Sequence, residues 1–457
     1  MDSVIKCGAI ATGDGSRLLY HKALWVKDGV VADITGVDEI PAASDIRIID
    51  AESWLVAPGA VNYHTHGCAA GPLYPSGAEP LPRSRVIGNI RRHLSQGTTT
   101  ICNVCGFSRF SDIEGLKEET GANLCLTTAH TPASLKAAEM VDGKGLTDAH
   151  KTMTVQEMAE QNAVAVGESG GGHTLGGGGQ DYLYIPQAIL QKTNVTINTF
   201  QAKALKLAVL SRYMDFSGFN RTEVDHLLRE YGLQHLITPE ETAEIIRKSV
   251  MTSIGTALEG FDETMAAARE TGLPVIYHTS APSVKKIEEL LLRNRREVTV
   301  VAAHCNHDTF EVEEAVIWAE RLKALGAVID LGTFDITEQS QQFSGVSPEY
   351  FDRLGESGLA DIISTDYNGG YWDGVYEGMS RLVRKGFCDI PRAIAMGTGN
   401  VRKAIPRIAP RRGLIQKGFH ADFVITDPAE ISHIKEVYIN GLVAWSNTTP
   451  TKKEGSE

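Results

Sequence analysis

The chain has 457 residues, a net charge of −13 and seven cysteines. This length predicts one large domain and a smaller one, and the acidic charge disfavours nucleic acid or an anionic membrane as a partner. An odd number of scattered cysteines fits a reducing cytoplasm better than a disulfide framework. The sequence has no signal-peptide pattern and no uncharged apolar run that could span a bilayer, so we expect a cytoplasmic protein without a membrane partner.

Both ends of the chain have the pattern of short β-strands. Asp28-Gly29 and Asn440-Gly441 each lie between two apolar runs, which is a strong signal for a β-hairpin. We therefore expect residues 1–54 and 410–447 to form one small β-sandwich domain from both termini. Residues 448–457 are polar and are expected to form a flexible tail.

Between these ends, short apolar runs alternate with segments of helical pattern, which indicates repeated β-α units and a parallel sheet. The expected helices include residues 261–270, 284–294 and 311–325. Eight units predict an α/β fold of the (β/α)8 TIM-like barrel type over residues 55–409. A longer helical stretch, about 201–259, is interpreted as an insertion that forms a lid or an oligomer contact. The eight expected strands cover residues 56–64, 98–104, 124–129, 163–168, 274–278, 298–304, 327–331 and 361–366.

Histidines and acids stand at the ends of five of these expected strands. The catalytic groups of such a barrel lie at the carboxyl ends of its strands. Each residue has an ordinary explanation, as a hydrogen-bonded core histidine or a helix cap, but that explanation would have to hold at every position. Imidazole and carboxylate ligands without thiolates favour Zn²⁺, Fe²⁺ or Mn²⁺. The candidate ligands are His64, His66, Glu168, His278, His304 and Asp366.

The ordered set resembles the amidohydrolase superfamily of metal-dependent hydrolases. Pro58-Gly59 stands ahead of His64-Thr65-His66, and the remaining ligand positions follow in the superfamily's order. Residues 396–400 and 413–422 resemble the segments that lead back into the small β domain. Many members carry a carboxylated lysine at the end of the fourth strand, whereas this chain has Glu168, as in the enamidase-like branch. The N-acetylglucosamine-6-phosphate deacetylase branch also uses a glutamate ligand and is a possible relative.

The resemblance implies a site with one or two divalent ions, zinc being expected ahead of iron or manganese. His64, His66 and Asp366 would hold one ion, His278 and His304 a second, and Glu168 would bridge them. The implied reaction is hydrolysis of a C–N bond in a small amide or cyclic amide by a metal-activated hydroxide. Asp366 would be the catalytic residue that carries the proton from the attacking water to the leaving nitrogen.

Three other functions stay open. One is a deaminase of an amino-substituted heterocycle, although the stretch around His278 lacks the neighbouring carboxylate that such deaminases use. Another is an N-acyl hydrolase of the deacetylase type. The third is a regulatory relative that kept the barrel and lost its metal, which the presence of all six ligand residues disfavours. In every enzymatic case the partner is a small molecule, and we expect a homo-oligomer.

Four further residues are candidates for contact with the substrate. His307 follows His304 closely, His173 lies in the glycine-rich loop after Glu168, and Asn368 and Tyr371 follow Asp366. For each of them an ordinary loop or packing role is a comparable explanation. Cys102 and Cys105 form a Cys-x-x-Cys pair without a second pair, so we expect buried thiols and not a structural zinc.

Overall fold

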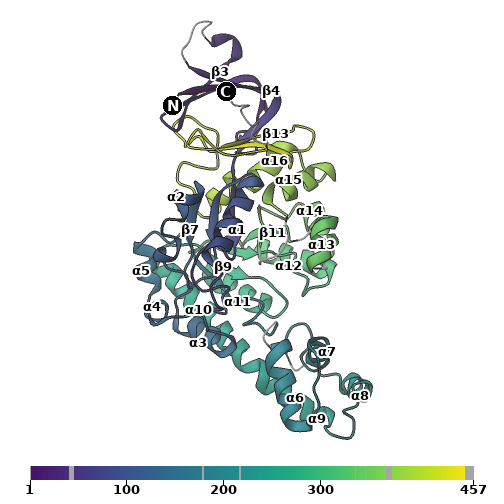
Figure 1. Cartoon of the computed structure of the whole chain (residues 1–457). Coiled ribbons are helices and arrows are strands. Elements are labelled where there is room, and N and C mark those ends of the chain that lie inside the picture. Colours follow the sequence, from purple (N-terminus) through teal and green to yellow (C-terminus); the bar gives the residue numbers. More distant parts are fainter. Residues whose placement is uncertain are drawn as a thin grey trace, which may run out of the picture.

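A computed structural model describes residues 2–40, 46–177, 180–215, 218–334, 336–344, 346–366 and 373–447. The protein is a mixed α/β structure with three parts (Figure 1). A sheet built from both ends of the chain lies at the top of the figure, parallel strands and their helices occupy the middle, and a helical lobe lies at the bottom.

Strands near the two ends form one seven-stranded sheet in the order β15-β14-β13-β4-β1-β2-β3. Both expected hairpins are present, and Asp28, Gly29, Asn440 and Gly441 all have the positive φ angles that such two-residue turns require. One apolar cluster contains residues from both ends, among them Leu24 and Phe423. The bounds are β1 Ser3–Ile10, β2 Leu19–Lys27, β3 Val30–Gly36, β4 Arg47–Pro58, β13 Phe423–Thr426, β14 Ile434–Ile439 and β15 Leu442–Ser446.

The middle region contains all eight expected strands, paired in parallel as β5-β6-β7 and as β8-β9-β10-β11-β12. The first begins at Ala60, because the preceding residues to Pro58 belong to β4 of the terminal sheet. Thr128 connects the two groups, since its N–H donates to Ala165 O (3.1 Å) and its carbonyl accepts from Gly167 N (2.7 Å). The bounds are β5 Ala60–Thr65, β6 Thr98–Asn103, β7 Asn123–Leu126, β8 Val166–Ser169, β9 Val275–His278, β10 Val300–Ala303, β11 Val328–Gly332 and β12 Ile362–Ser364.

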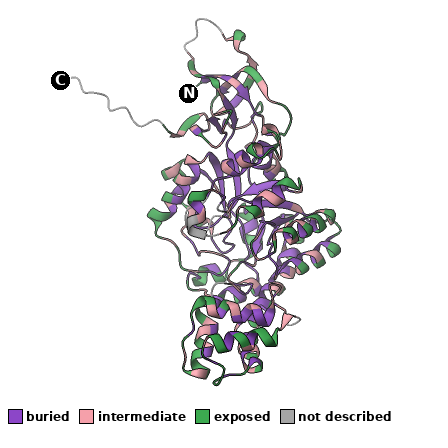
Figure 2. Cartoon of the chain, turned by 90° about the vertical axis from the view of Figure 1, so that its right-hand side faces the viewer, coloured by how far each residue is buried: buried purple, intermediate pink, exposed green. Residues whose placement is uncertain are grey.

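Helices surround these strands, and their buried sides face the centre (Figure 2). In α11, Val284, Ile287 and Leu291 are buried, the spacing of one helical face. The expected helices are confirmed, although the one at 261–270 is the second half of α10. The bounds are α1 Arg83–Ser95, α2 Leu116–Thr120, α3 Pro132–Val141, α4 Asp148–Lys151, α5 Val155–Glu160, α10 Thr252–Thr271, α11 Val284–Asn294, α12 Val312–Ala324, α13 Glu338–Ser344, α14 Glu349–Glu356, α15 Val375–Arg384, α16 Ile390–Met396 and α17 Gly399–Ala404.

The helical lobe has an apolar core of its own. Ile189, Leu205, Val224 and Ile246 belong to one buried cluster, separate from the cluster that surrounds the parallel strands. The lobe includes a helix before residue 201, so the insertion is longer than expected from the sequence. Among the described residues, no helix is long and apolar enough to cross a membrane. The lobe comprises α6 Ile185–Thr193, α7 Thr199–Leu210, α8 Arg221–Glu230 and α9 Pro239–Ile246.

Candidate metal centre

The structure brings the six candidate ligands together at the carboxyl ends of five parallel strands. His64 and His66 lie at the end of β5, where alternation along a strand directs both side chains to the same face. Thr65 between them points the other way and donates to Cys102 O (2.9 Å). The remaining four lie at the ends of β8, β9, β10 and β12; they are Glu168, His278, His304 and Asp366.

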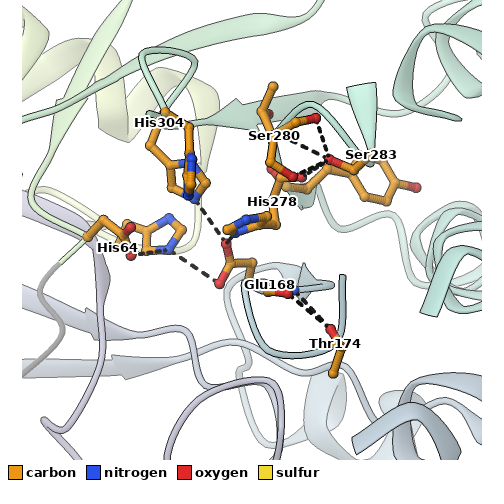
Figure 3. A network of polar contacts seen from close by, with 12 residues as sticks. His64, Glu168, Thr174, His278, Ser280, Ser283 and His304 are labelled. Atoms are coloured by element: carbon orange, nitrogen blue, oxygen red, sulfur yellow. Dashed lines mark hydrogen bonds and ion pairs between the residues drawn. The ribbon is translucent and has the colours of Figure 1, made fainter. Parts of the chain in front are cut away.

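Glu168 lies between two pairs of histidines, of which Figure 3 labels His64, His278 and His304. Its Oε1 is 3.0 Å from His278 Nδ1 and 3.1 Å from His304 Nε2. Its Oε2 is 3.5 Å from His64 Nε2 and 3.6 Å from His66 Nε2. Each carboxylate oxygen therefore faces a different pair of imidazoles, which is the arrangement that a residue shared between two ions requires.

The contacts of His64 test whether these residues fit a metal. Its ring is fully buried, and neither ring nitrogen has a hydrogen-bond partner among the described residues. Asp366 Oδ1 lies 3.4 Å from Nε2 of both His64 and His66. Two ligand atoms that are each about 2.1 Å from one tetrahedral ion stand roughly 3.4 Å apart. These distances, too long for hydrogen bonds, leave the room that a divalent ion needs between its ligands.

The two acids of the group suit a cation. Burial alone would lower the pKa of His304, but in the metal-free chain Asp366 and Glu168 raise it to about 9, so a metal would displace a proton there. Burial alone would raise the pKa of Glu168, but the adjacent imidazoles, foremost His64, hold it well below its ordinary value. Burial would also raise the pKa of Asp366, but the imidazoles of His304, His66 and His64 lower it. Both carboxyl groups are therefore ionised at neutral pH. Burial lowers the pKa of His278 to about 4, so this imidazole is neutral and its lone pair is available to a metal.

Two of the candidate ligands have unusual backbone conformations. His304 and Asp366 have φ angles of 36° and 47°, in the left-handed region that non-glycine residues seldom adopt. Asp330, buried in β11, supports this part of the structure, since its Oδ2 accepts from His304 N (2.7 Å) and Ser364 Oγ (2.8 Å). Strain of this kind collects at functional sites, where the surrounding contacts maintain it.

Asp330 was not among the residues expected from the sequence. It is a single acid within the apolar stretch Val328–Gly332, and it is fully buried. Burial raises the pKa of its carboxyl group. A lone acid in an otherwise apolar strand is the signal that could have identified it, because a buried carboxyl group needs hydrogen-bond donors.

The four residues expected to contact the substrate lie at different distances from the candidate ligands, and two of them are not described. The His307 ring centroid lies 5.1 Å from that of His278 and 5.4 Å from that of His304, so this residue borders the group. His173 is separated from His66 by the Tyr74 ring, which lies 5.5 Å from the first and 5.4 Å from the second. Asn368 and Tyr371 lie outside the described residues.

A cavity of about 350 Å³ extends from the candidate ligands to the helical lobe. His278 and His307 form part of its wall on the side of the metal group. Lys203 and Leu207 of α7 and Gly176 of the loop after β8 also line this cavity. The insertion thus helps to shape the space beside the ligands, as a small-molecule site requires.

Three cations line this cavity, and two of them have carboxylate partners. Lys206 Nζ lies 2.7 Å from Asp181 Oδ1, and Arg212 forms an ion pair with Glu314. Lys203 is exposed and forms no direct ion pair with a described residue, but His307 and, to a smaller extent, the charge of Lys203 lower the pKa of Asp308, which lines the same cavity. The Lys203 amine is therefore the cavity cation that is available to a ligand.

No protein-family model matches the sequence. In sequence, the chain is 34% identical over 95 residues to the enamidase of Eubacterium barkeri, an alignment of 21% of this chain and 22% of the enamidase, so it spans about a fifth of that relative. The solved enamidase structure, described as a new member of the amidohydrolase superfamily, has a TM-score of 0.53 at 17% identity, with 99% of each chain covered. This chain has the fold of the amidohydrolase superfamily. The resemblance to that superfamily is confirmed, and enamidase is similar in both sequence and structure.

Two other solved structures extend the comparison of the amidohydrolase fold. The β-aspartyl dipeptidase of Fervidobacterium islandicum AW-1 has a TM-score of 0.56 at 16% identity, covering 99% of both chains. The N-acyl-D-glutamate deacylase of Bordetella bronchiseptica, in complex with zinc and a phosphonate inhibitor, has a TM-score of 0.54 at 15% identity, covering 98% of both chains. These likenesses extend over nearly the whole chain, including both the terminal sheet and the parallel strands.

Proposed function

We propose that this chain is a metal-dependent hydrolase that cleaves the C–N bond of a small amide or cyclic amide. The position of Glu168 carries the proposal, because its two oxygens face two separate pairs of buried imidazoles. We further propose that the eight parallel strands close into a (β/α)8 barrel with this group at its mouth. The similar enzymes support the reaction class, since their names denote action on an enamide, a β-aspartyl dipeptide and an N-acyl amino acid.

We propose that His64, His66 and Asp366 hold one divalent ion and that His278 and His304 hold a second, with Glu168 between them. Zinc is the expected metal, with iron and manganese as alternatives, because imidazoles and carboxylates are the donors and zinc is present in one similar structure. When bound, such ions lower the pKa of a water molecule and polarise a carbonyl group.

Asp366 is the residue that we assign to proton transfer. Its Oδ1 faces the two imidazoles of β5, which leaves Oδ2 to take the proton. Its side chain is 16% exposed, whereas that of Glu168 is 2% exposed, so Asp366 is the more accessible of the two acids. Its lowered pKa keeps the carboxylate ionised at neutral pH, which is the form that can take a proton from the attacking water and pass it to the leaving nitrogen.

An N-acyl amino acid hydrolase is the more specific candidate within this class. Lys203 forms no direct ion pair with a described carboxylate, although its charge acts on Asp308, which also lines the cavity and lies 3.1 Å from the ring of His307. A substrate carboxylate would give the exposed Lys203 amine a direct partner. We assign His307 to contact with the bound substrate, because it lines both the cavity and the metal group.

A turnover screen on metal-loaded protein tests the proposal. The panel contains lactams, cyclic imides, N-acyl amino acids and aminoheterocycles, and metal content is measured on the same sample. We expect metal-dependent cleavage of an amide bond, and we expect Asp366→Asn to lower turnover by about 10²–10⁴-fold while the fold is retained. Near-normal turnover of that variant would remove the proton-transfer role. Ammonia release from aminoheterocycles alone would establish a deaminase, and a protein without stoichiometric metal would exclude the class.

We also propose that the enzyme works in the cytoplasm as a homo-oligomer on a small molecule, without a nucleic-acid or membrane partner. All seven cysteines are unpaired, which suits a reducing compartment. On the helical lobe Phe200 is 84% exposed and Leu190 is 41% exposed, and apolar residues of this kind favour a contact between copies. Sedimentation of the native chain and of Phe200→Ser decides the oligomeric part of this proposal: a native monomer would exclude it.

A further inference from the structure

The second ring nitrogen of His66 faces a cysteine. While Nε2 points to Glu168 and Asp366, Nδ1 lies 3.3 Å from the sulfur of Cys105. Both residues are buried, with exposed fractions of 5% for His66 and 1% for Cys105. A metal-binding histidine usually donates its other N–H to a carboxylate, a backbone carbonyl or water. Here a thiol occupies the place of that acceptor.

The neighbours of Cys105 determine which atom is the donor in its contact with His66. Its Sγ lies 3.5 Å from Asn103 Oδ1, which also accepts from the backbone N–H of Cys68 (3.2 Å). A backbone N–H can only donate, so the Asn103 atom at this position is the amide oxygen and not the nitrogen. The Cys105 S–H therefore donates to Asn103, and its sulfur accepts from the Nδ1–H of His66. With the proton held on Nδ1, the Nε2 lone pair is free.

We propose that Cys105 is a positioning residue that holds His66 in the tautomer and orientation needed to bind a metal through Nε2. The inference rests on the proposed function, because it takes His66 to be a metal ligand. It also gives a role to one half of the Cys-x-x-Cys pair. The other half, Cys102, belongs to a separate apolar cluster with Val61 and Val164 and makes no hydrogen bond with His66 among the described residues.

Metal affinity measured without substrate tests this inference. Full-length protein is stripped of metal, and the zinc dissociation constant of native chain, Cys105→Ala, Cys105→Ser and Cys102→Ala is determined by competition with a chromophoric chelator. We expect Cys105→Ala to weaken zinc binding by about 10–100-fold, the usual effect of losing such a partner. Serine can donate to Asn103 and accept from His66 as cysteine does, so the zinc dissociation constant of Cys105→Ser should stay within a few fold of the native value. Cys102→Ala, an equally buried substitution in the same segment, should bind zinc as the native chain does.

Three results would overturn the inference: native affinity in Cys105→Ala, equal losses in the alanine and serine variants, or the same loss in Cys102→Ala. Thermal unfolding of the metal-free variants separates a folding defect from a weakened site. Cobalt-loaded native protein supplies an independent readout, because a sulfur-to-cobalt charge-transfer band would show that Cys105 is itself a ligand. If the native chain binds no metal, the proposed function fails; if it binds metal and Cys105→Ala binds equally well, only the positioning role fails.

Discussion

Asn62 and Thr365 join the first and last parallel strands across 303 residues of sequence. The Asn62 Nδ2 donates to Thr365 Oγ1 (2.8 Å), and its Oδ1 accepts from Thr365 N (3.3 Å). His64 follows two residues after the first partner, and Asp366 follows directly after the second. One buried amide therefore fixes how far apart these two candidate ligands lie.

Replacement of Asn62 with alanine should weaken both the fold and the metal site. Thr365 would lose the two hydrogen bonds that it makes with Asn62, although its hydroxyl still donates to His64 O (3.2 Å), and this loss costs about 1–3 kcal/mol of unfolding free energy. Urea unfolding of the metal-free protein measures that loss, and chelator competition measures zinc affinity. Asn123→Ala is the matched control, because this buried amide binds Thr99 O and Asp422 instead. If both variants lose stability and zinc affinity alike, the strand connection has no specific role in the site.

Replacement of one partner of the buried Lys206–Asp181 pair should destabilise the helical lobe strongly. Lys206 is 2% exposed, and its removal leaves a buried carboxylate unpaired, so Lys206→Met should cost about 3–5 kcal/mol. The double variant Lys206→Met/Asp181→Leu should recover most of that loss. Urea unfolding and limited proteolysis of the lobe measure the effect. The exposed pair Arg221–Glu240 is the control, and its disruption should change stability by about 1 kcal/mol or less.

Stability should fall as the pH is lowered below about 6.5, in part because of His130. Burial lowers the pKa of this imidazole from 6.5 to about 4. Its Nδ1 contacts Thr128 Oγ1 (2.9 Å), while Nε2 is buried without a partner among the described residues. The unfolded chain takes up this proton first, so between pH 6.5 and 4 the group removes about 1.4 kcal/mol of stability per pH unit.

Urea unfolding across that pH range, on the native chain and on His130→Gln, checks the contribution of His130. The substitution removes the titrating group, so the variant should lose less stability between neutral and acidic pH than the native chain does. Parallel curves for the two proteins would assign the acid sensitivity to other groups.

Lys203 should select ligands that carry an acid group. Loss of a hydrogen bond to a charged partner is worth about 1.5–3 kcal/mol, so Lys203→Met should weaken binding of an N-acyl amino acid by about 10–100-fold. Binding of the matching N-acyl amino acid amide should be nearly unchanged, and kcat should change less than KM. Lys192→Met is the control, since this exposed lysine pairs with Glu241 on the lobe. Equal effects on the acid and on its amide would contradict the assignment.

Much of the fold was predictable because its elements leave local patterns. The turns at Asp28-Gly29 and Asn440-Gly441 and the apolar runs of the middle strands were expected, and they are present. The break at Gly59 was not expected, because the apolar run continues through it. A side chain at that glycine would meet Thr99 atoms at 2.2 Å, so a close approach between strands fixes this residue type. No local pattern records an approach of that kind.

Part of the candidate site was likewise predictable from the sequence, and part was not. The six candidate ligands could be predicted because each residue ends a patterned strand, and the structure brings all six together. Asn62, Asp330 and Cys105 were missed as contributors because their roles depend on partners from other strands or loops. A contact across 303 residues leaves no periodic signal, and only the folded chain shows which buried polar groups meet.

The terminal sheet has a consequence for the order of events during synthesis. β4 pairs with β1 on one edge and with β13 on the other, and β13 ends at Thr426. A ribosome delivers residues in order, so one edge of β4 remains unpaired while all eight parallel strands, the last of which ends at Ser364, are synthesised. The nascent chain must therefore keep this apolar edge from associating with other polypeptides until residues 423–426 have been synthesised.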